Sequence, residues 1–335
     1  MSKNILISDP TLRDGSHAIK HQLSLEQIES YCLLAEEAGV PIVEVGHGNG
    51  LGASSLQLGL SSYTDAEMLT KARKNLKKTM LGIHIIPGFA TIKKDLEPAI
   101  DYGVDVVRVA CHCTEADLTE NHISFARKKG MIVWGCLMMS HMLSDKLLLE
   151  QVLKMKEYGA EGVVIMDSAG TYLPENVFNR VSTLIDGTNI DIGFHAHNNL
   201  GLGVANSISA IEAGATLIDG SSRGFGAGAG NAQLEVLIAV LTKMKINTGV
   251  DLYKILDLGN LAEEILMDKI PSIQTNSIIS GLAGVFSGFA KPVNRIAMEI
   301  NVDPRDIFME LGKRNIIAGQ EDKILEVAME IKANE

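Results

Sequence analysis

Eight short apolar segments recur along the chain, and each is followed by a segment with the pattern of a helix. The apolar segments are aliphatic, often β-branched and almost continuously apolar, which is typical of parallel strands buried on both faces. Several of the intervening segments begin at Ser, Thr or Asp and end at Gly, as helices do. The predicted strands lie at 4–9, 41–46, 80–87, 104–110, 131–138, 161–167, 190–197 and 216–221. The predicted helices lie at 24–39, 64–76, 95–103, 119–130, 144–160, 173–186, 203–215 and 231–245.

The number and order of these units predict a (β/α)8 TIM barrel. Such a barrel uses about 250 residues, and the strand–helix alternation occupies residues 1–265 of this chain. A doubly wound open sheet is the alternative, although it rarely needs eight evenly spaced units. The strand segments then stop, and the helical periodicity of residues 266–335 predicts a small all-helical C-terminal domain that packs on the barrel or over its mouth.

The composition argues against nucleic-acid and membrane partners. The chain has a formal net charge of −11, and its Lys and Arg residues form only short helical clusters, so we expect no nucleic-acid binding. The sequence has no stretch of the roughly 18 apolar residues that span a bilayer, and its first residues lack the apolar core of a signal peptide. We therefore expect a cytoplasmic protein whose four cysteines are reduced thiols.

Histidines gather at the ends of the predicted strands, where TIM-barrel enzymes place their active sites. Seven of the nine lie within or just after a predicted strand, and only His21 and His122 lie elsewhere. In "GFHAHNNLG", His195 and His197 are two residues apart, so a strand would direct both side chains to one face. We therefore expect an active site at the mouth of the barrel.

Asp14, in "TLRDGSH", follows the first predicted strand. In a closed barrel the first strand adjoins the eighth and the seventh is next, so Asp14 can meet His195 and His197. Two imidazoles and one carboxylate form a site for a divalent metal with open positions for water and substrate. Oxygen and nitrogen ligands without thiolate favour Mn²⁺, Co²⁺ or Mg²⁺ over structural zinc. The alternative is that Asp14 caps a loop and the two histidines hydrogen-bond internally.

Charged residues beside this site suggest catalytic and structural roles. Arg13 could neutralise the negative charge that develops when an enolate forms. His17 could take a proton from a substrate hydroxyl, because the pKa of histidine lies near working pH. Glu44 and Arg108 lie inside predicted strands, and we expect them to form a buried ion pair that stiffens the barrel, in preference to a direct catalytic role.

The glycine-rich segment "GFGAGAGN" at 224–231 follows the last predicted strand and precedes a helix. Anion binding at the N-terminus of that helix is one interpretation. The segment lacks the Gly-x-x-x-x-Gly-Lys-Ser/Thr pattern and a following ribose-binding acid. We therefore prefer a tight turn that lets backbones approach closely.

Six motifs spread along the chain carry a family resemblance. They read "TLRDGSHAIKHQ", "RVACHCTEAD", "LMMSHM", "HAHNNLGLGVANS", "GAGAGNAQLEV" and "GQEDKI". In this order they resemble the 4-hydroxy-2-oxovalerate aldolases, which are pyruvate-specific class II aldolases of the DRE-TIM metallolyase superfamily. The resemblance runs from about residue 5 to the C-terminus. It implies reversible cleavage of 4-hydroxy-2-oxopentanoate, or a related 4-hydroxy-2-oxo acid, to pyruvate and acetaldehyde or another aldehyde, as in aromatic hydrocarbon catabolism.

The resemblance also implies roles for individual residues. Arg13 would stabilise the pyruvate enolate, and His17 would be the base that deprotonates the 4-hydroxyl group. The bound metal would be Mn²⁺, which would also hold the keto and carboxylate oxygens of the 2-oxo acid. Its ligands would be Asp14, His195 and His197. Arg13, Asp14 and His195 would also bind the substrate.

Four further positions concern the substrate pocket. Ser168, in "MDSAG", matches a family serine that contacts pyruvate. The chain reads "AGVFSGF" where the family typically has "AGVYSSF", so Phe286 lacks a hydroxyl that contacts substrate or water. It reads "HIIPG" where "LLLPG" is typical, which places His84 and Ile86 in the aldehyde pocket and replaces an aliphatic residue by a histidine. Since a buried polar group usually needs a partner, we expect the aldehyde half of the substrate to be larger or more polar than acetaldehyde.

Two rival functions stay open at this point. A Claisen-type synthase that uses an acyl-CoA usually has an acid in its glycine loop, as in "GxGERxGN", whereas the loop of this chain has none. A non-catalytic subunit is the second rival, and the tyrosine replaced by Phe286 keeps it open.

Two kinds of protein partner are expected. The family resemblance implies an acylating aldehyde dehydrogenase that accepts the aldehyde through a channel, with the helical C-terminal domain as its docking surface. We also expect the chain to form an oligomer.

Overall fold

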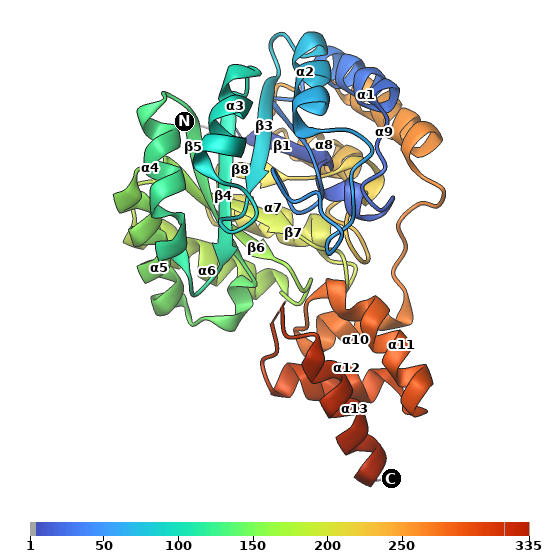
Figure 1. Cartoon of the computed structure of the whole chain (residues 1–335). Coiled ribbons are helices and arrows are strands. Elements are labelled where there is room, and N and C mark those ends of the chain that lie inside the picture. The colour runs from blue at the N-terminus through green and yellow to red at the C-terminus, as the bar shows by residue number, and fades with distance from the viewer. Residues whose placement is uncertain (1–4, 318, 335) are drawn as a thin grey trace.

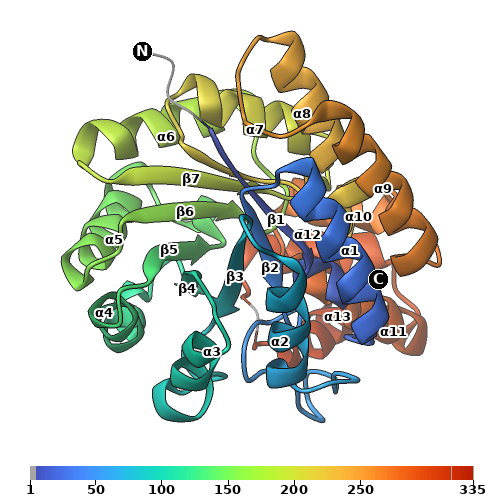
Figure 2. The ribbon, with the colours of Figure 1, turned by 90° about the horizontal axis from the view of Figure 1, so that it is seen from above.

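The computed structural model of the chain describes residues 5–317 and 319–334, and eight parallel strands form its centre (Figures 1 and 2). The strands pair in chain order, and β1 pairs with β8, so the sheet closes into a barrel. The strands are β1 Leu6–Leu12, β2 Ile42–Val45, β3 Met80–Ile85, β4 Val106–His112, β5 Ile132–Met138, β6 Gly162–Asp167, β7 Asp191–Ala196 and β8 Leu217–Asp219. Each overlaps a predicted strand. The barrel is confirmed, and the open sheet is excluded because closure leaves no edge strand.

Helices surround the strands, as Figure 2 shows from above. Ser24 starts the first helix with a capping box, in which Ser24 and Gln27 each accept the other's backbone N–H, and Gly39 ends it in the left-handed conformation. These helices are α1 Leu25–Ala38, α2 Asp65–Asn75, α3 Glu97–Asp101, α4 Glu120–Lys128, α5 Asp145–Tyr158, α6 Pro174–Gly187, α7 Gly203–Glu212, α8 Leu234–Lys243 and α9 Leu252–Leu266. Each of the first eight overlaps a predicted helix.

Two helical segments differ from the prediction. The helix expected at 95–103 is shorter, because a π-helical turn at Ile92–Leu96 precedes α3 and Pro98 fits only a first helical turn. The sequence reading did not identify α9, which packs against α1, where the Gln27 side chain donates to the Ile265 carbonyl at 2.5 Å. This second helix after β8 completes the outer layer.

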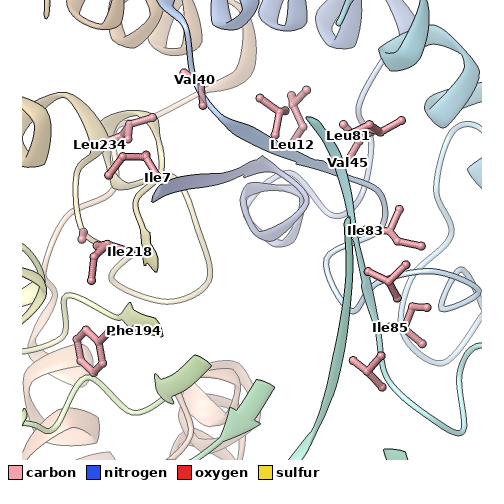
Figure 3. Close-up of a cluster of buried hydrophobic side chains, with 14 of the residues drawn as sticks. Ile7, Leu12, Val40, Val45, Leu81, Ile83, Ile85, Phe194, Ile218 and Leu234 are labelled. Atoms are coloured by element: carbon pink, nitrogen blue, oxygen red, sulfur yellow. The ribbon is translucent and has the colours of Figure 1, made fainter. Parts of the chain in front are cut away.

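The strands are buried on both faces, which explains their continuous apolar character. Their outward side chains pack under the helices, and Figure 3 shows Ile7, Ile83 and Phe194 in this layer. A separate apolar cluster, which includes Ile42 and Trp134, fills the inside of the barrel. Polar and charged side chains take the remaining inward positions near the mouth.

The C-terminal helices have a core of their own, which includes Phe289 and Phe308. They lie against the carboxyl ends of the strands, below the barrel in Figure 1. His141, after β5, hydrogen-bonds to the Gly284 carbonyl at 3.0 Å, and the Asn199 side chain donates to the Ser277 carbonyl. The helices are α10 Thr275–Ala283, α11 Ala290–Ile300, α12 Pro304–Lys313 and α13 Asp322–Asn334. The predicted all-helical extension is confirmed, while a domain boundary between residues 265 and 266 stays a prediction.

None of the helices in the described parts of the chain is long and apolar enough to cross a membrane.

Candidate active site and metal centre

The predicted metal ligands meet at the mouth of the barrel. His195 points inward from β7 and His197 follows that strand, while Asp14 begins a short 3₁₀ helix, Asp14–His17, after β1. One potential ligand atom from each of these three buried residues lies within 4.8 Å of the other two. The strand alternation that sends Phe194 outward sends the two histidines inward, so the geometry agrees with the metal-site interpretation.

The hydrogen bonds around these side chains leave nitrogen atoms free for a metal. His195 Nδ1 lies 2.8 Å from Asp219 Oδ2, and its Nε2 is buried without a hydrogen-bond partner among the described residues. A carboxylate that holds the far nitrogen of an imidazole is the usual outer partner of a metal-binding histidine. His197 Nδ1 is likewise buried and unpartnered in the described part of the chain. The donor set therefore fits a divalent cation.

The protonation states suit metal binding. Burial would raise the pKa of Asp14, but the charges of Arg13 and His197 outweigh it and hold that pKa well below its usual range. Burial, followed by the neighbouring His195, lowers the pKa of His197 to about 3. The carboxyl group is therefore ionised and the imidazole neutral near neutral pH, as ligation requires.

A chain of buried ion pairs connects the two sides of the site. Arg13 Nε donates to Glu44 at 2.9 Å, and Arg108 donates to the other oxygen of Glu44 at 2.6 Å. Arg108 also donates to both oxygens of Asp219, at 3.0 and 2.7 Å. Burial would raise the pKa of Glu44, but Arg108 and Arg13 lower it to about 2. The predicted Glu44–Arg108 pair is confirmed, and it continues at one end to Arg13 and at the other to the carboxylate that holds His195.

The guanidinium group of Arg13 is held by hydrogen bonds, but one of its nitrogen atoms makes none with the described residues. Its Nη1 donates to Asp14 Oδ1 at 3.0 Å and to the Gly48 carbonyl at 3.3 Å. Its Nη2 is buried without a partner in the described residues. An immobilised cation with a free donor beside a metal site can bind a developing oxyanion.

His17 belongs to a cluster of three histidines. Its ring packs on the Gly48 backbone and lies edge-on to His21 with ring centres 5.1 Å apart, while His21 stacks on His47 with ring centres 3.6 Å apart. Burial lowers the pKa of His17, so the ring is neutral near pH 7 and can accept a proton. His21 was not predicted to belong to the site because it follows no predicted strand. The turn after the 3₁₀ helix places its ring beside those of His17 and His47.

The residues predicted to contact pyruvate and the aldehyde lie on different elements. Ser168, after β6, accepts the Met139 backbone N–H at 2.9 Å, so its own hydroxyl proton can be donated elsewhere. His84 lies on β3, and Ile86 packs on the apolar cluster inside the barrel. Phe286 packs on the C-terminal core, with its ring 6.1 Å from Phe289. The structure thus places Phe286 in the C-terminal layer, two residues after the Gly284 contact with the barrel.

The glycine-rich segment folds into a tight turn against the metal ligands. A Cβ on Gly226 would lie 2.6 Å from Asp14 Oδ2 and 2.5 Å from Asn231 Nδ2, and one on Gly230 would lie 2.1 Å from the Gly224 carbonyl. The tight-turn interpretation is confirmed. The turn also brings in Asn231, which donates to Asp14 Oδ2 at 2.7 Å and whose Oδ1 is buried without a partner in the described chain.

Sequence reasoning missed Asn231 and Asp219. Neither makes its contacts with a neighbour in the sequence: the partner of Asn231 is 217 residues away, and His195 is 24 residues from Asp219. The available signals were weak. Asp219 is the charged residue of the last predicted strand, and Asn231 closes the glycine-rich turn.

A closed barrel with a carboxylate and two histidines at its carboxyl mouth defines a TIM-barrel enzyme with a candidate site for a divalent metal. The sequence matches a protein-family model described as HMGL-like over residues 4–262, and one described as a DmpG-like communication domain over residues 271–333. The chain belongs to the family of 4-hydroxy-2-oxovalerate aldolases, as its full-length relatives show.

Two such relatives carry the name 4-hydroxy-2-oxovalerate aldolase. The protein from Spirochaeta aurantia is 62% identical over 98% of this chain and 96% of its own length. The protein from Pectobacterium atrosepticum is 58% identical over 100% of this chain and 98% of its own length. Both alignments therefore include the barrel and the C-terminal helices.

Solved structures share the fold at low sequence identity. The carboxyl transferase domain of Rhizobium etli pyruvate carboxylase, solved with pyruvate, superposes with a TM-score of 0.82 at 14% identity. The match covers 99% of this chain and 61% of that one. At this identity the likeness supports the fold alone.

Proposed function

We propose that this chain is a metal-dependent carbon–carbon lyase that reversibly cleaves a 4-hydroxy-2-oxo acid to pyruvate and a short aldehyde. The observation that carries the proposal is the convergence of Asp14, His195 and His197 beside the free donor of Arg13. The full-length relatives named 4-hydroxy-2-oxovalerate aldolase support the same chemistry, with 4-hydroxy-2-oxopentanoate as the reference substrate.

Asp14, His195 and His197 would hold the metal, with the unpartnered Oδ1 of Asn231 as a candidate further oxygen ligand. Mn²⁺ is the proposed ion, and Co²⁺ or Mg²⁺ suit the same nitrogen and oxygen donors. A bound ion would supply Lewis-acid polarisation of the 2-oxo acid.

His17 and Arg13 divide the remaining chemistry. His17, neutral because its pKa is lowered by burial, takes the proton of the 4-hydroxyl group. The C3–C4 bond then breaks, the aldehyde leaves with C4, and the electron pair stays on C3 as the pyruvate enolate. Arg13 Nη2 donates to the enolate oxygen, while Glu44 and Asp14 hold the guanidinium group in place. A proton from water then adds at C3 to complete pyruvate, and His17 releases its own proton to the solvent.

The remaining predicted contacts are assigned by position. Ser168 would contact pyruvate, whereas His84, Ile86 and Phe286 would lie toward the aldehyde. The acyl-CoA synthase alternative gains no support, because the glycine-rich loop has Ala227 and Gly228 where the synthase motif has its Glu-Arg pair.

A protein partner is proposed for the C-terminal helices. The match of residues 271–333 to a communication domain supports docking of an acylating aldehyde dehydrogenase that receives the aldehyde. An oligomer of this chain is part of the same proposal.

The experiment that tests the proposed function is release of pyruvate from 4-hydroxy-2-oxopentanoate by protein stripped with a chelator. We expect release to begin when Mn²⁺ is added and to be absent in the stripped protein. Metal that binds without any release of pyruvate, from this or related 4-hydroxy-2-oxo acids, would contradict the proposed reaction.

A further inference from the structure

His84 is a polar side chain inside the barrel that the proposed chemistry does not use. It lies opposite Arg108 in the pairing of β3 with β4, and Arg108 points into the barrel. Two residues earlier on the same inward face, a Cβ on Gly82 would meet Glu44 at 3.3 Å. The side chain is only 3% exposed. His84 thus occupies the inward layer of the ion-pair chain, on the side formed by β2, β3 and β4.

The imidazole of His84 has a hydrogen-bonding atom that the described protein leaves unused. Its Nδ1 is buried and has no partner among residues 5–317 and 319–334. Burial, followed by the nearby charge of Arg13, lowers the pKa of His84 well below its usual value. The ring is therefore neutral, and a neutral imidazole offers one donor and one acceptor nitrogen. A buried polar atom normally has a partner, so a substrate group is a candidate for that role.

The orientation of the substrate follows from the residues on either side. The metal ligands come from β1 and β7, so the keto and carboxylate end of the 2-oxo acid lies on that side of the barrel. His17, the proposed base for the 4-hydroxyl group, packs on Gly48, which follows β2. C4 therefore lies toward β2, and the carbon attached to it extends toward β3, where His84 lies.

We propose that His84 hydrogen-bonds to a polar group on the carbon next to C4, so that the preferred aldehyde carries a hydroxyl or carbonyl oxygen beside its reacting carbon. This inference rests on the proposed aldolase function and names the class of its aldehyde. An alkyl group at the same place would leave the imidazole nitrogen without a partner, and sites built to bind a hydroxyl discriminate strongly against its absence. The proposed binding of pyruvate and of the metal is unchanged by this contact, because it uses other residues than His84.

The test compares two aldehydes of nearly equal size, glycolaldehyde and propanal, as acceptors for pyruvate. The quantity measured is the ratio of kcat/KM for the two, in the Mn²⁺-loaded protein. We expect the wild-type chain to favour glycolaldehyde by about tenfold or more. His84→Leu should abolish or reverse this preference, and His84→Gln, which keeps hydrogen-bonding atoms, should retain part of it.

His122→Leu provides a matched control. His122 on α4 also has a buried Nδ1 without a partner in the described chain, while its other nitrogen bonds to the Ala90 carbonyl outside the barrel. The same substitution there should leave the ratio unchanged. Circular dichroism shows whether each variant folds. If His84→Leu does not fold, the ratio of kcat/KM for the two aldehydes in the wild-type chain still decides the test.

The outcomes separate the two proposals. Equal use of both aldehydes by the wild-type chain, or a ratio that His84→Leu leaves unchanged, would overturn the role of His84 while pyruvate release from 4-hydroxy-2-oxopentanoate continues. Absence of that release and of both aldol products would overturn the aldolase function and the role of His84 together.

Discussion

At the scale of single residues, the site depends on side chains that hold other side chains. Asp219 binds His195 on one side and Arg108 on the other, and Glu44 joins Arg108 to Arg13. Because all of these groups are buried, each charge relies on its partner. The orientation of the candidate metal ligand His195 and that of Arg13, the proposed enolate-binding residue, therefore depend on one network.

Asp219→Asn tests this network directly. The substitution weakens the hold on His195 and removes a charge facing Arg108, so we expect Mn²⁺ affinity to fall by about 10- to 100-fold. Titration of free Mn²⁺ by electron paramagnetic resonance measures the affinity. Asp191→Asn, an exposed acid at the start of β7, is the control and should bind Mn²⁺ as the wild type does. Equal affinities in both variants would show that Asp219 does not orient the ligand.

The pH dependence of cleavage tests the role of His17. The base must be neutral, and burial lowers the pKa of His17 from its ordinary 6.5, so kcat/KM should fall only as the pH drops below about 6.5. Burial lowers the pKa of His21 to about 3 and that of His47 to about 4. Protonation of these two rings therefore does not contribute to a fall in kcat/KM that begins just below pH 6.5. His17→Ala should reduce kcat by about 10²- to 10⁴-fold and keep Mn²⁺ binding. A variant that retains the wild-type rate and pH profile would assign the base elsewhere.

At the scale of elements, strands β1 and β7 position the candidate metal ligands, and the turn after β8 packs against Asp14. Gly226 lies so close to Asp14 and Asn231 that no side chain fits between them. The backbone of this turn is therefore part of the metal site, although it contributes no ligand of its own. Its small residues let the turn close over the ligand carboxylate.

Gly226→Ala is expected to displace Asp14 or Asn231, because the added methyl group would lie about 2.5–2.6 Å from their side-chain atoms. Mn²⁺ affinity should fall, while circular dichroism stays that of the folded barrel. Gly259→Ala in α9 is the matched control, since its Cβ would have ordinary contacts at 3.4 Å or more and Ala favours a helix interior. Unchanged affinity in Gly226→Ala would mean that the turn adapts without moving the ligands.

The sequence was sufficient to predict the eight strands and the eight helices that follow them, but not α9 or all of the contacts between elements. Parallel strands buried on both faces leave a strong local pattern, so β1 to β8 could be placed from apolar runs alone. His195 and His197 could be paired because strand alternation is itself local. Asp219 and Asn231 enter the site through contacts between distant parts of the chain, and α9 has no preceding strand to mark it, so local patterns could not identify them.

At the scale of the whole molecule, the chain has two cores. Among the described residues the barrel cluster and the cluster of α10–α13 have no side chain in common, and the backbone carbonyls of Gly284 and Ser277 accept hydrogen bonds across the boundary. The helical layer covers the mouth side of the barrel (Figure 1). This position suits a layer through which a partner could reach the aldehyde end of the site.

Separate cores predict separate unfolding steps. Phe308 is fully buried in the C-terminal core, and Phe308→Ala should destabilise that core by about 3–5 kcal/mol. Differential scanning calorimetry should then show an early transition that Mn²⁺ does not shift, and a later barrel transition that Mn²⁺ raises, since a ligand stabilises the unit that binds it. A single calorimetric transition that shifts to higher temperature when Mn²⁺ is added would show instead that the two cores unfold together.

The central claim is that Asp14, His195 and His197 form one metal site, and anomalous X-ray diffraction from crystals soaked in Mn²⁺ tests it most directly. Data collected at the manganese absorption edge should give one strong anomalous peak bound by the Asp14 carboxylate and one nitrogen of each histidine. The peak should disappear in crystals of Asp14→Ala. A strong peak held by other residues, with none between these three side chains, would contradict the account.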